Sequence, residues 1–263
     1  MSYETISLVI DKRGVATLCL ERPDKHNALN AQMIAELRDA AAIINSASDI
    51  RVVVLTGNGR SFCAGGDVNW FAENIERDRN GRIAESSTLA DMLADLDQLQ
   101  KPLIGKINGA AYGGGVGMIS VCDIAVGVEC SKFGLTEVRL GLLPANISPY
   151  VVARIGVNNS RATMLSGALF SATHAQSIGL LNHVVDEATI DAAIEGIVQD
   201  HLQAAPEAVA ATKKLIRYVA SHAMQDNMIY TADRLADAWE TEEGKTGIDC
   251  FLNRTTPPWR TNE

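Results

Sequence analysis

The sequence predicts an α/β fold in which strands and helices alternate through the first two thirds and helices dominate the last third. Short β-branched runs that end in glycine, such as RVVVLTG at 51–57, predict buried strands, while other segments carry apolar residues at helical spacing. This alternation is typical of layered α/β domains. We expect a core domain over residues 1–200 and a helical region over residues 201–263, with no clear linker between them.

The N-terminal segment predicts a hairpin followed by a helix. Residues 6–23 contain two alternating apolar runs around Asp11–Gly14, which favours a β-hairpin. Asn30 is a suitable N-cap for a helix over residues 31–46, because its side chain can accept a backbone N–H. The apolar face of this helix would comprise Met33, Leu37, Ala40, Ala41 and Ile44.

The middle of the chain alternates between polar and apolar segments. Residues 74–85 are charged and only weakly periodic, so we expect a mobile surface stretch there. An amphipathic helix is predicted over 88–100, followed by strands at 101–107 and 122–128. From Ile147 onward almost all signals are helical.

Composition excludes several classes of protein. The chain of 263 residues is 47% hydrophobic and 21% charged, and no apolar stretch reaches the roughly 20 residues of a membrane span. The N-terminus lacks a signal-peptide pattern, so we expect a cytoplasmic protein that does not bind membranes. A net charge of −9 argues against nucleic-acid binding. The five cysteines and five histidines show no metal-ligand spacing, so no metal site is expected.

Two glycine-rich loops share one design. AGGD at 64–67 and YGGGVG at 112–117 each follow a buried strand and precede a helix. Glycine lets another atom approach the backbone closely, and the first N–H groups of a helix are free. Two such donors on one oxygen would form an oxyanion hole. Close strand–helix packing is the structural alternative, and dinucleotide binding is disfavoured because the spacing is GxGxG rather than GxGxxG.

Four stretches together resemble the enoyl-CoA hydratase/isomerase (crotonase) superfamily. They are ERPDKHNALN at 21–30, GRSFCAGGDV at 59–68, KPLIGKINGAAYGGGVGMISVCDIAV at 101–126 and FGLTEVRLGLLP at 133–144, and a weaker match is the tail at 239–259. The resemblance covers essentially the whole chain. It implies a spiral of ββα turns, a C-terminal helical region that forms a homotrimer or a hexamer of two trimers, and an acyl-CoA substrate.

The resemblance also implies a set of site residues. Gly66 and Gly114 match the two oxyanion N–H donors, and Glu137 matches a catalytic glutamate. No cofactor is implied, because coenzyme A is part of the substrate. The residues that match substrate- or CoA-binding positions are Lys25, His26, Ala64, Gly65, Asp67, Gly117, Trp239 and Arg254, the last two toward a neighbouring subunit's CoA.

Gly117 is the main departure from the family pattern. Hydratases of the family usually carry a first glutamate at this position, which together with the second holds one water. Glycine here leaves two chemistries open, namely isomerisation by a single carboxylate or hydration with another group orienting the water. Asn146 and Ser148 are candidates for that group, although both also suit a helix N-terminus.

Several motifs resemble bacterial methylglutaconyl-CoA hydratases of leucine breakdown. The motifs are GGDVNWF, GGGVGM and EVRLGLLPANISPYVVARIG. We expect glycine at position 117 to make room for a branched acyl chain. The distal carboxylate of such a chain needs a cation, for which Arg139, Lys106, Arg154 and the arginines of 74–85 are candidates.

The sequence thus predicts a hydro-lyase that hydrates a 3-methylglutaconyl-like enoyl-CoA through Glu137. A Δ3,Δ2-enoyl-CoA isomerase of the same fold is the first alternative. A noncatalytic CoA- or RNA-binding member is the alternative from another class, disfavoured by the acidic charge and by the retained Glu137.

Overall fold

The computed structural model describes residues 3–260 and contains two sheets with helices on both sides. The large sheet begins with the predicted hairpin, which is confirmed because its first two strands pair antiparallel around Asp11–Gly14. All later pairs in this sheet are parallel. In spatial order its strands are β1 (Ile6–Ile10), β2 (Val15–Leu20), β3 (Val52–Gly57), β5 (Leu103–Ile107), β7 (Ile124–Val128) and β10 (His183–Val185).

The large sheet is buried on both faces. Along β3, Val53 and Leu55 join the core that contains helix α1 (Ala31–Ser46). Val52 and Val54 point to the opposite face and pack with α7 (Ile190–Leu202). A strand covered on both sides reads as one continuous apolar run, which explains why RVVVLTG was recognisable as buried.

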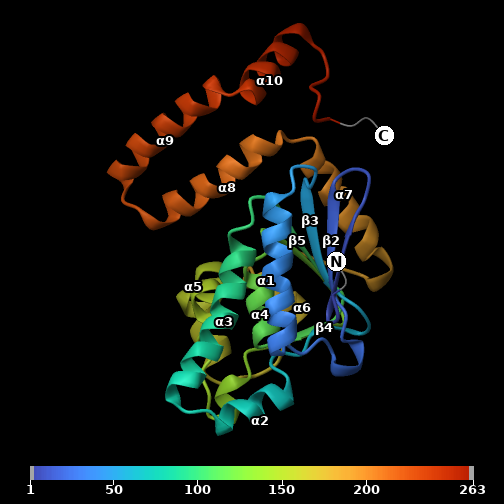
Figure 1. The fold of residues 1–263 in the computed structure, drawn as a ribbon, viewed down its shortest axis with the longest axis vertical. Coiled ribbons are helices and arrows are strands. Elements are labelled where there is room, and N and C mark those ends of the chain that lie inside the picture. The colour runs from blue at the N-terminus through green and yellow to red at the C-terminus, as the bar shows by residue number, and fades with distance from the viewer. Residues whose placement is uncertain (1–2, 261–263) are drawn as a thin grey trace.

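Helix α1 confirms the predicted cap and the predicted face. Asn30 Oδ1 accepts the Met33 N–H at 2.9 Å, which satisfies one free donor of the first turn. The buried residues of the helix include all five of the predicted apolar face. The helix lies against α3 (Arg79–Asp97), and the two cover one side of the sheet in Figure 1.

The small sheet has four strands, each three residues long or less. Their spatial order is β4 (Ser61–Cys63), β6 (Ala110–Tyr112), β8 (Lys132–Gly134) and β9 (Phe170–Ser171). The first three pair parallel, and β9 pairs antiparallel with β8. Strands of two or three residues are too short to show a periodic pattern, so they could not be recognised in the sequence.

The charged stretch 74–85 lies at the surface, as predicted, but most of it is helical, which the sequence did not indicate. Helix α2 (Val68–Glu76) runs through its first part, and α3 begins at Arg79, nine residues before the predicted helix. Asp78 caps α3 by accepting the Gly81 N–H at 2.7 Å. This cap stabilises a first turn that has no apolar periodicity of its own.

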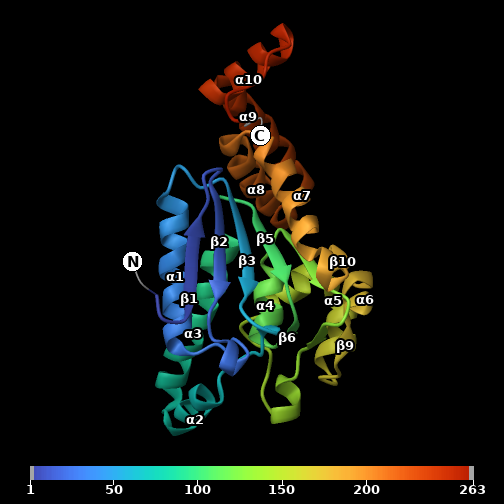
Figure 2. The ribbon, with the colours of Figure 1, turned by 90° about the vertical axis from the view of Figure 1, so that its right-hand side faces the viewer.

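The remaining helices complete the core and form a projecting region. The short helices α4 (Gly114–Ser120) and α6 (Ala172–Ser177) and the longer α5 (Ser148–Met164) lie with the core. Helices α8 (Pro206–Ser221), α9 (Met224–Glu240) and α10 (Glu242–Asn253) extend away from it, at the end opposite α2 (Figures 1 and 2). Within residues 3–260 no helix combines the length and apolarity that a membrane crossing requires.

Candidate active site

Three neighbouring strands of the small sheet deliver the three predicted catalytic residues to one edge. Gly66 follows β4, Gly114 follows β6, and Glu137 follows β8. Because β4, β6 and β8 are adjacent and parallel, the loops at their carboxyl ends meet at the same edge. All three residues line one cavity of about 450 Å³.

The two glycine loops touch and leave their N–H groups free. A Cβ built on Gly65 would lie 3.9 Å from the Cα of Gly113, so the loops are in van der Waals contact. Within residues 3–260, the N–H groups of Gly66 and Gly114 donate no hydrogen bond. Free donors that border one cavity are the arrangement that an oxyanion hole needs.

Both the backbone conformation and the available space explain why residue 113 is a glycine. Its φ of 47° and ψ of −114° lie in a region that side chains rarely allow. A Cβ here would also lie 2.9 Å from Oε1 of Glu137. The bare backbone therefore lets the carboxylate approach the start of α4.

Glu137 combines burial with an unsatisfied oxygen. It begins the 3₁₀ helix η2 (Glu137–Leu140), and its Oε2 atom is buried without a hydrogen-bond partner among the described residues. Burial raises the pKa of Glu137 above its ordinary value of 4.5, because removal from water disfavours the charged form. A carboxyl group of raised pKa in a cavity is suited to proton transfer.

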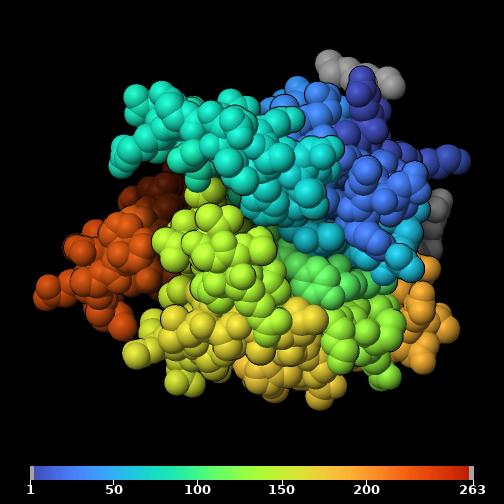
Figure 3. All heavy atoms as spheres, turned by 90° about the horizontal axis from the view of Figure 1, so that it is seen from below, coloured from blue at the N-terminus to red at the C-terminus, as the bar shows by residue number. Residues whose placement is uncertain are grey.

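The cavity lining is mostly apolar and includes a few polar side chains. Leucine, isoleucine, tryptophan, phenylalanine and proline side chains supply most of the lining. Figure 3 views the molecule from the α2 end, where α2 and the start of α3 adjoin the segment that follows β8. Apart from Glu137, the charged or polar side chains of the lining are Asn74, Arg82, Ser86, Asn146 and the indole of Trp70.

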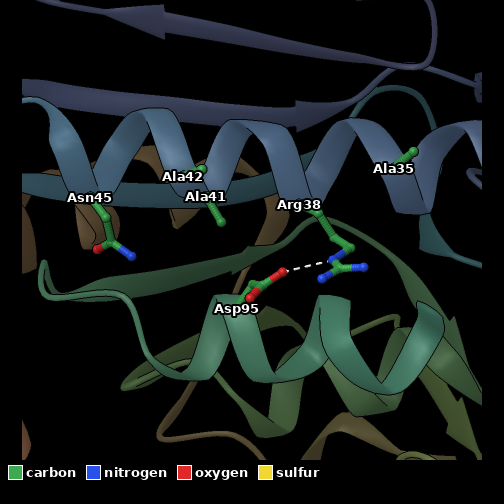
Figure 4. Close-up of a pocket in the computed structure, with 6 residues that line it drawn as sticks. All are labelled: Ala35, Arg38, Ala41, Ala42, Asn45 and Asp95. Carbon is green, nitrogen blue, oxygen red and sulfur yellow. Dashed lines mark hydrogen bonds and ion pairs between the residues drawn. The ribbon is translucent and has the colours of Figure 1, made fainter. Parts of the chain in front are cut away.

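A second hollow of about 570 Å³ lies between α1 and α3 (Figure 4). Three alanines line it, and Arg38 donates to Asp95 at 2.8 Å across it. Small side chains between two packed helices explain this hollow. Among its lining residues the one acid, Asp95, is held by the ion pair, so the cavity of Glu137 is the better candidate for the active site.

Gly117 does not make room for substrate, so that expectation was wrong. The residue is buried in α4 and lies outside the cavity lining. A Cβ built on it would lie 3.0 Å from the Cβ of Ile147 and closer still to Cγ2 of the same side chain. The space that a larger residue would occupy is filled by Ile147, with Leu93 beyond it.

The two candidates proposed to replace the missing glutamate differ in position. Asn146 lines the cavity and makes hydrogen-bond contacts with Ser86. Ser148 is in the first turn of α5, donates to the Ala145 carbonyl at 2.8 Å, and lies outside the lining. The structure therefore favours Asn146 over Ser148.

The residues matched to the CoA pocket lie beside the glycine loops, outside the cavity lining. The carbonyl of His26 accepts the Ala64 N–H at 2.9 Å, and His26 Nδ1 contacts Ser61 Oγ at 3.0 Å. Lys25 is exposed, and Gly65 has a φ of 91°. A role for His26 through its backbone, together with the CoA contacts of Lys25 and Ala64, stays a prediction.

Asp67 has a structural role in this geometry. It is buried, receives a hydrogen bond from Arg22 at 2.8 Å, and caps α2 by accepting the Asn69 N–H. Burial opposes its ionisation, but the hydrogen bonds from Arg22 and from the Asn69 N–H lower the pKa of the carboxyl group. Its oxygens hold the loop after Gly66 rather than face the cavity.

Trp239 and Arg254 lie far from this cavity within one chain. Trp239 is 59% exposed on α9, and Arg254 ends α10 with a φ of 56°. Both helices lie at the end of the molecule opposite α2 (Figure 2). Their contact with CoA therefore requires a second copy and stays a prediction.

Several lining residues were missed by sequence reasoning. Trp70 donates its indole N–H to Glu85 at 2.8 Å, which joins α2 to α3. Arg82, Ser86 and Leu89 follow each other at spacings of four and three on α3, so they share one helix face toward the cavity. That spacing was the available signal for Ser86 and Leu89, whereas Arg82 was already among the arginines of 74–85 named as candidate cations.

Comparison with known proteins gives one consistent result. A model of the family described as Enoyl-CoA hydratase/isomerase matches residues 11–262. The 2,3-dehydroadipyl-CoA hydratase of Escherichia coli is 30% identical over 96% of this chain and 98% of its own. An Alternaria alternata enoyl-CoA hydratase, AKT6-1, is 35% identical over 80% of this chain and 68% of its own.

Solved structures agree over nearly the whole chain. An enoyl-CoA hydratase from Shewanella pealeana superimposes with a TM-score of 0.94 at 33% identity, covering 97% of this chain and 96% of the other. Pseudomonas aeruginosa AtuE gives a TM-score of 0.94 at 31% identity, covering 98% and 100%. The predicted α/β spiral with C-terminal helices is confirmed.

Proposed function

Because the chain belongs to the enoyl-CoA hydratase/isomerase family and is an enzyme that acts on acyl-CoA, we propose that it hydrates a carboxylated enoyl-CoA with Glu137 as its only catalytic carboxylate. The observation that carries this proposal is that Glu137 lines the same cavity as Gly66 and Gly114, while its buried Oε2 has no hydrogen-bond partner among the described residues. A carboxylate that receives no hydrogen bond from the protein is free to accept a hydrogen bond from a bound water.

The geometry supports one proton path. The N–H groups of Gly66 and Gly114 stabilise the negative charge that develops on the thioester oxygen. Glu137 removes a proton from water as the water oxygen bonds to Cβ, and the electron pair of the double bond moves to form the enolate. The protonated Glu137 returns a proton to Cα, so the net change is the addition of one water.

We further propose that the acyl chain is of the 3-methylglutaconyl type, as in leucine breakdown. The motif resemblance supports it, and the E. coli relative is named for a dicarboxylic acyl-CoA substrate. Gly117 no longer contributes to this proposal, because Ile147 fills the space beside it. The support for a carboxylated chain comes instead from Arg82.

Arg82 is the best placed of the candidate cations. Lys106 forms an ion pair with Asp191, and Arg154 donates to the carbonyls of Cys122 and Leu180. Arg139 donates to the Ser166 carbonyl at 3.2 Å. None of these three lines the cavity.

Arg82 lines the cavity, and its guanidinium retains unused hydrogen-bond donors. Its Nε and Nη2 atoms donate to the carbonyls of Asn74 and Ile75 at 2.9 and 2.7 Å, near the end of α2. Within residues 3–260 it forms no ion pair. A guanidinium with a remaining N–H fork is suited to a substrate carboxylate.

A substrate panel with one matched pair of variants tests this assignment. We expect Arg82→Met to raise KM about 10-fold or more for carboxylated enoyl-CoAs and to leave uncharged straight-chain substrates nearly unchanged, since a charge-assisted hydrogen bond is lost. Arg79→Met, three residues earlier on α3 and outside the cavity lining, is the control. An equal effect of Arg82→Met on both substrate classes would contradict the assignment.

Isomerisation of the double bond is a second candidate function. It is favoured by Ile147, because an apolar side chain fills the space beside Gly117 and leaves Glu137 as the one carboxylate in the cavity lining. Loss of enoyl absorbance with a trans-2-enoyl-CoA indicates hydration, whereas gain of absorbance with a 3-enoyl-CoA indicates isomerisation. Absence of both activities would favour a noncatalytic CoA-binding role.

We also propose that the chain forms a homotrimer or a hexamer. Large apolar side chains are exposed on the projecting helices, among them Ile229 at 75% and Phe251 at 82%. Such surfaces mark interaction sites. Light scattering of the parent and of a Phe251→Asp variant tests this, because a charge at the interface would lower the mass of the assembly.

A further inference from the structure

Two polar residues of the cavity lining, Ser86 and Asn146, form a hydrogen-bonded pair. Ser86 comes from α3, and Asn146 comes from the loop that precedes α5. Ser86 Oγ lies 3.0 Å from Asn146 Oδ1 and 2.8 Å from Asn146 Nδ2. Both side chains are half-buried and line the cavity that also holds Glu137.

The pair retains hydrogen-bonding capacity whichever way its own bond runs. If Ser86 donates its one proton to Oδ1, both amide protons of Asn146 remain available. If Asn146 donates to Oγ instead, the Ser86 hydroxyl proton and a second amide proton remain available. Neither side chain has another side-chain partner within residues 3–260. A donor thus remains in each arrangement.

The loop that carries Asn146 is the same loop that fills the space beside Gly117. Ile147 packs onto Gly117, and the preceding residue lines the cavity. One short segment therefore fills the space beside Gly117 with Ile147 and brings the neutral amide of Asn146 to the cavity lining. Glu137 can take a proton from water, but a single carboxylate does not fix the direction of the water oxygen toward Cβ.

We propose that Ser86 and Asn146 are a positioning pair that holds the water activated by Glu137. This inference rests on the proposed hydration. Neither neutral side chain gains or loses a proton in the cycle: Glu137 accepts the proton of water and returns one to Cα, while the pair orients the oxygen. Removing the pair therefore impairs attack at Cβ and leaves proton exchange at Cα intact.

Two reactions measured on the same variants test the proposal. Hydration of a trans-2-enoyl-CoA requires an oriented water, whereas deuterium exchange at Cα of a saturated acyl-CoA in D2O requires only the oxyanion donors and Glu137. We expect Asn146→Ala and Ser86→Ala to lower kcat for hydration about 10- to 100-fold and to change Cα exchange less than about 2-fold. Ser86→Thr, which keeps the hydroxyl, is expected to retain most hydration.

Ser148→Ala is the matched control, because Ser148 lies two residues from Asn146 but outside the cavity lining. It is expected to leave both reactions unchanged. An equal fall of hydration and exchange in Asn146→Ala would indicate a structural role and overturn the proposal. A higher KM at unchanged kcat would also overturn it, because the pair would then bind the acyl chain. Absence of hydration in the parent would refute the proposed function itself.

Discussion

Glu36 and Glu137 show two opposite environments for a carboxylate in one chain. Glu36, on α1, is buried and accepts hydrogen bonds from the N–H groups of Glu4 and Thr5, the Thr5 hydroxyl and the Gln32 amide. Burial alone would raise its pKa, but these donors lower it to about 2. Glu137 has a buried oxygen without a donor, and burial raises its pKa.

The difference separates a structural acid from the acid that we propose as catalytic. The groups that donate to Glu36 belong to α1 and to the segment before β1, so the folded chain itself provides the hydrogen bonds that stabilise its negative charge. Glu137 lines the cavity, and its buried Oε2 receives no hydrogen bond from the described residues, so folding leaves this carboxylate unsatisfied. Burial without partners lowers stability and supplies reactivity, whereas burial with partners does the reverse.

The largest expected effect is on Glu137. We expect Glu137→Gln to lower kcat for hydration about 10²- to 10⁴-fold, the usual contribution of general acid–base catalysis. Because the pKa of Glu137 is raised in the folded parent, the stability that its protonated form contributes below pH 4.5 is lost as pH rises through the raised pKa. The glutamine amide does not ionise, so the variant does not lose this stability. At pH 7 it should therefore unfold at the same temperature as the parent or at a higher one. Calorimetry and a rate assay on one preparation check both.

A smaller loss of activity is expected for Gly113→Ala. A methyl group would meet Oε1 of Glu137 and displace the carboxylate, which should lower kcat about 10²-fold. Gly156→Ala is the control, because Gly156 also has a positive φ, of 74°, but no atom near a built Cβ. Both variants should lose stability, and only the first should lose activity per folded molecule. A kcat of Gly113→Ala equal to that of the parent would show that a methyl group at position 113 does not displace the Glu137 carboxylate.

The reverse pattern is expected for Glu36→Gln. Replacing the acceptor of four hydrogen bonds should lower the free energy of unfolding by about 1.5–3 kcal/mol at pH 7. Activity per folded molecule should remain at the parental level, because Glu36 lies outside the cavity. Denaturant unfolding measures the first quantity and the rate assay the second. A large loss of kcat in Glu36→Gln would show that Glu36 is not a purely structural acid and would contradict its contrast with Glu137.

The smallest effect concerns acid stability. Because the folded pKa of Glu36 is lowered to about 2, its contribution is present above pH 4.5 and is lost as pH falls from 4.5 toward 2. The free energy of unfolding of the parent should therefore fall more steeply in this range than that of Glu36→Gln. Denaturant titrations at several pH values compare the slopes, and equal slopes would show that Glu36 is not the responsible group.

Local motifs made most of the site predictable. Gly66, Gly114 and Glu137 each follow a short strand within a recognisable stretch, and each lies at the edge of the cavity. Asn30 was recognisable as a cap because the interaction spans three residues. The second half of α3 was predicted from its apolar spacing, whereas the part from Arg79 was missed because the Asp78 cap stabilises it and its buried residues, Met92, Leu93 and Leu96, all lie in the second half.

Long-range packing set the limit of that prediction. Gly117 and Ile147 are far apart in sequence, so no local pattern could show that one side chain fills the space beside the other. The same holds for Ser86 and Asn146, which meet only because α3 lies across from the loop before α5. Strands as short as β4 and β6 carry no periodic signal, although their pairing brings the three catalytic loops together.

The pH dependence of kcat/KM for enoyl-CoA hydration tests the central claim most directly, because it reports the ionisation of the catalytic base in the free enzyme. Hydration requires ionised Glu137, so the rate should rise with pH through one ionisation. Its pKa should lie above the ordinary value of 4.5, in the direction that burial dictates. A rising limb at or below 4.5, or a rate independent of pH across that range, would contradict the assignment of Glu137 as the single catalytic carboxylate.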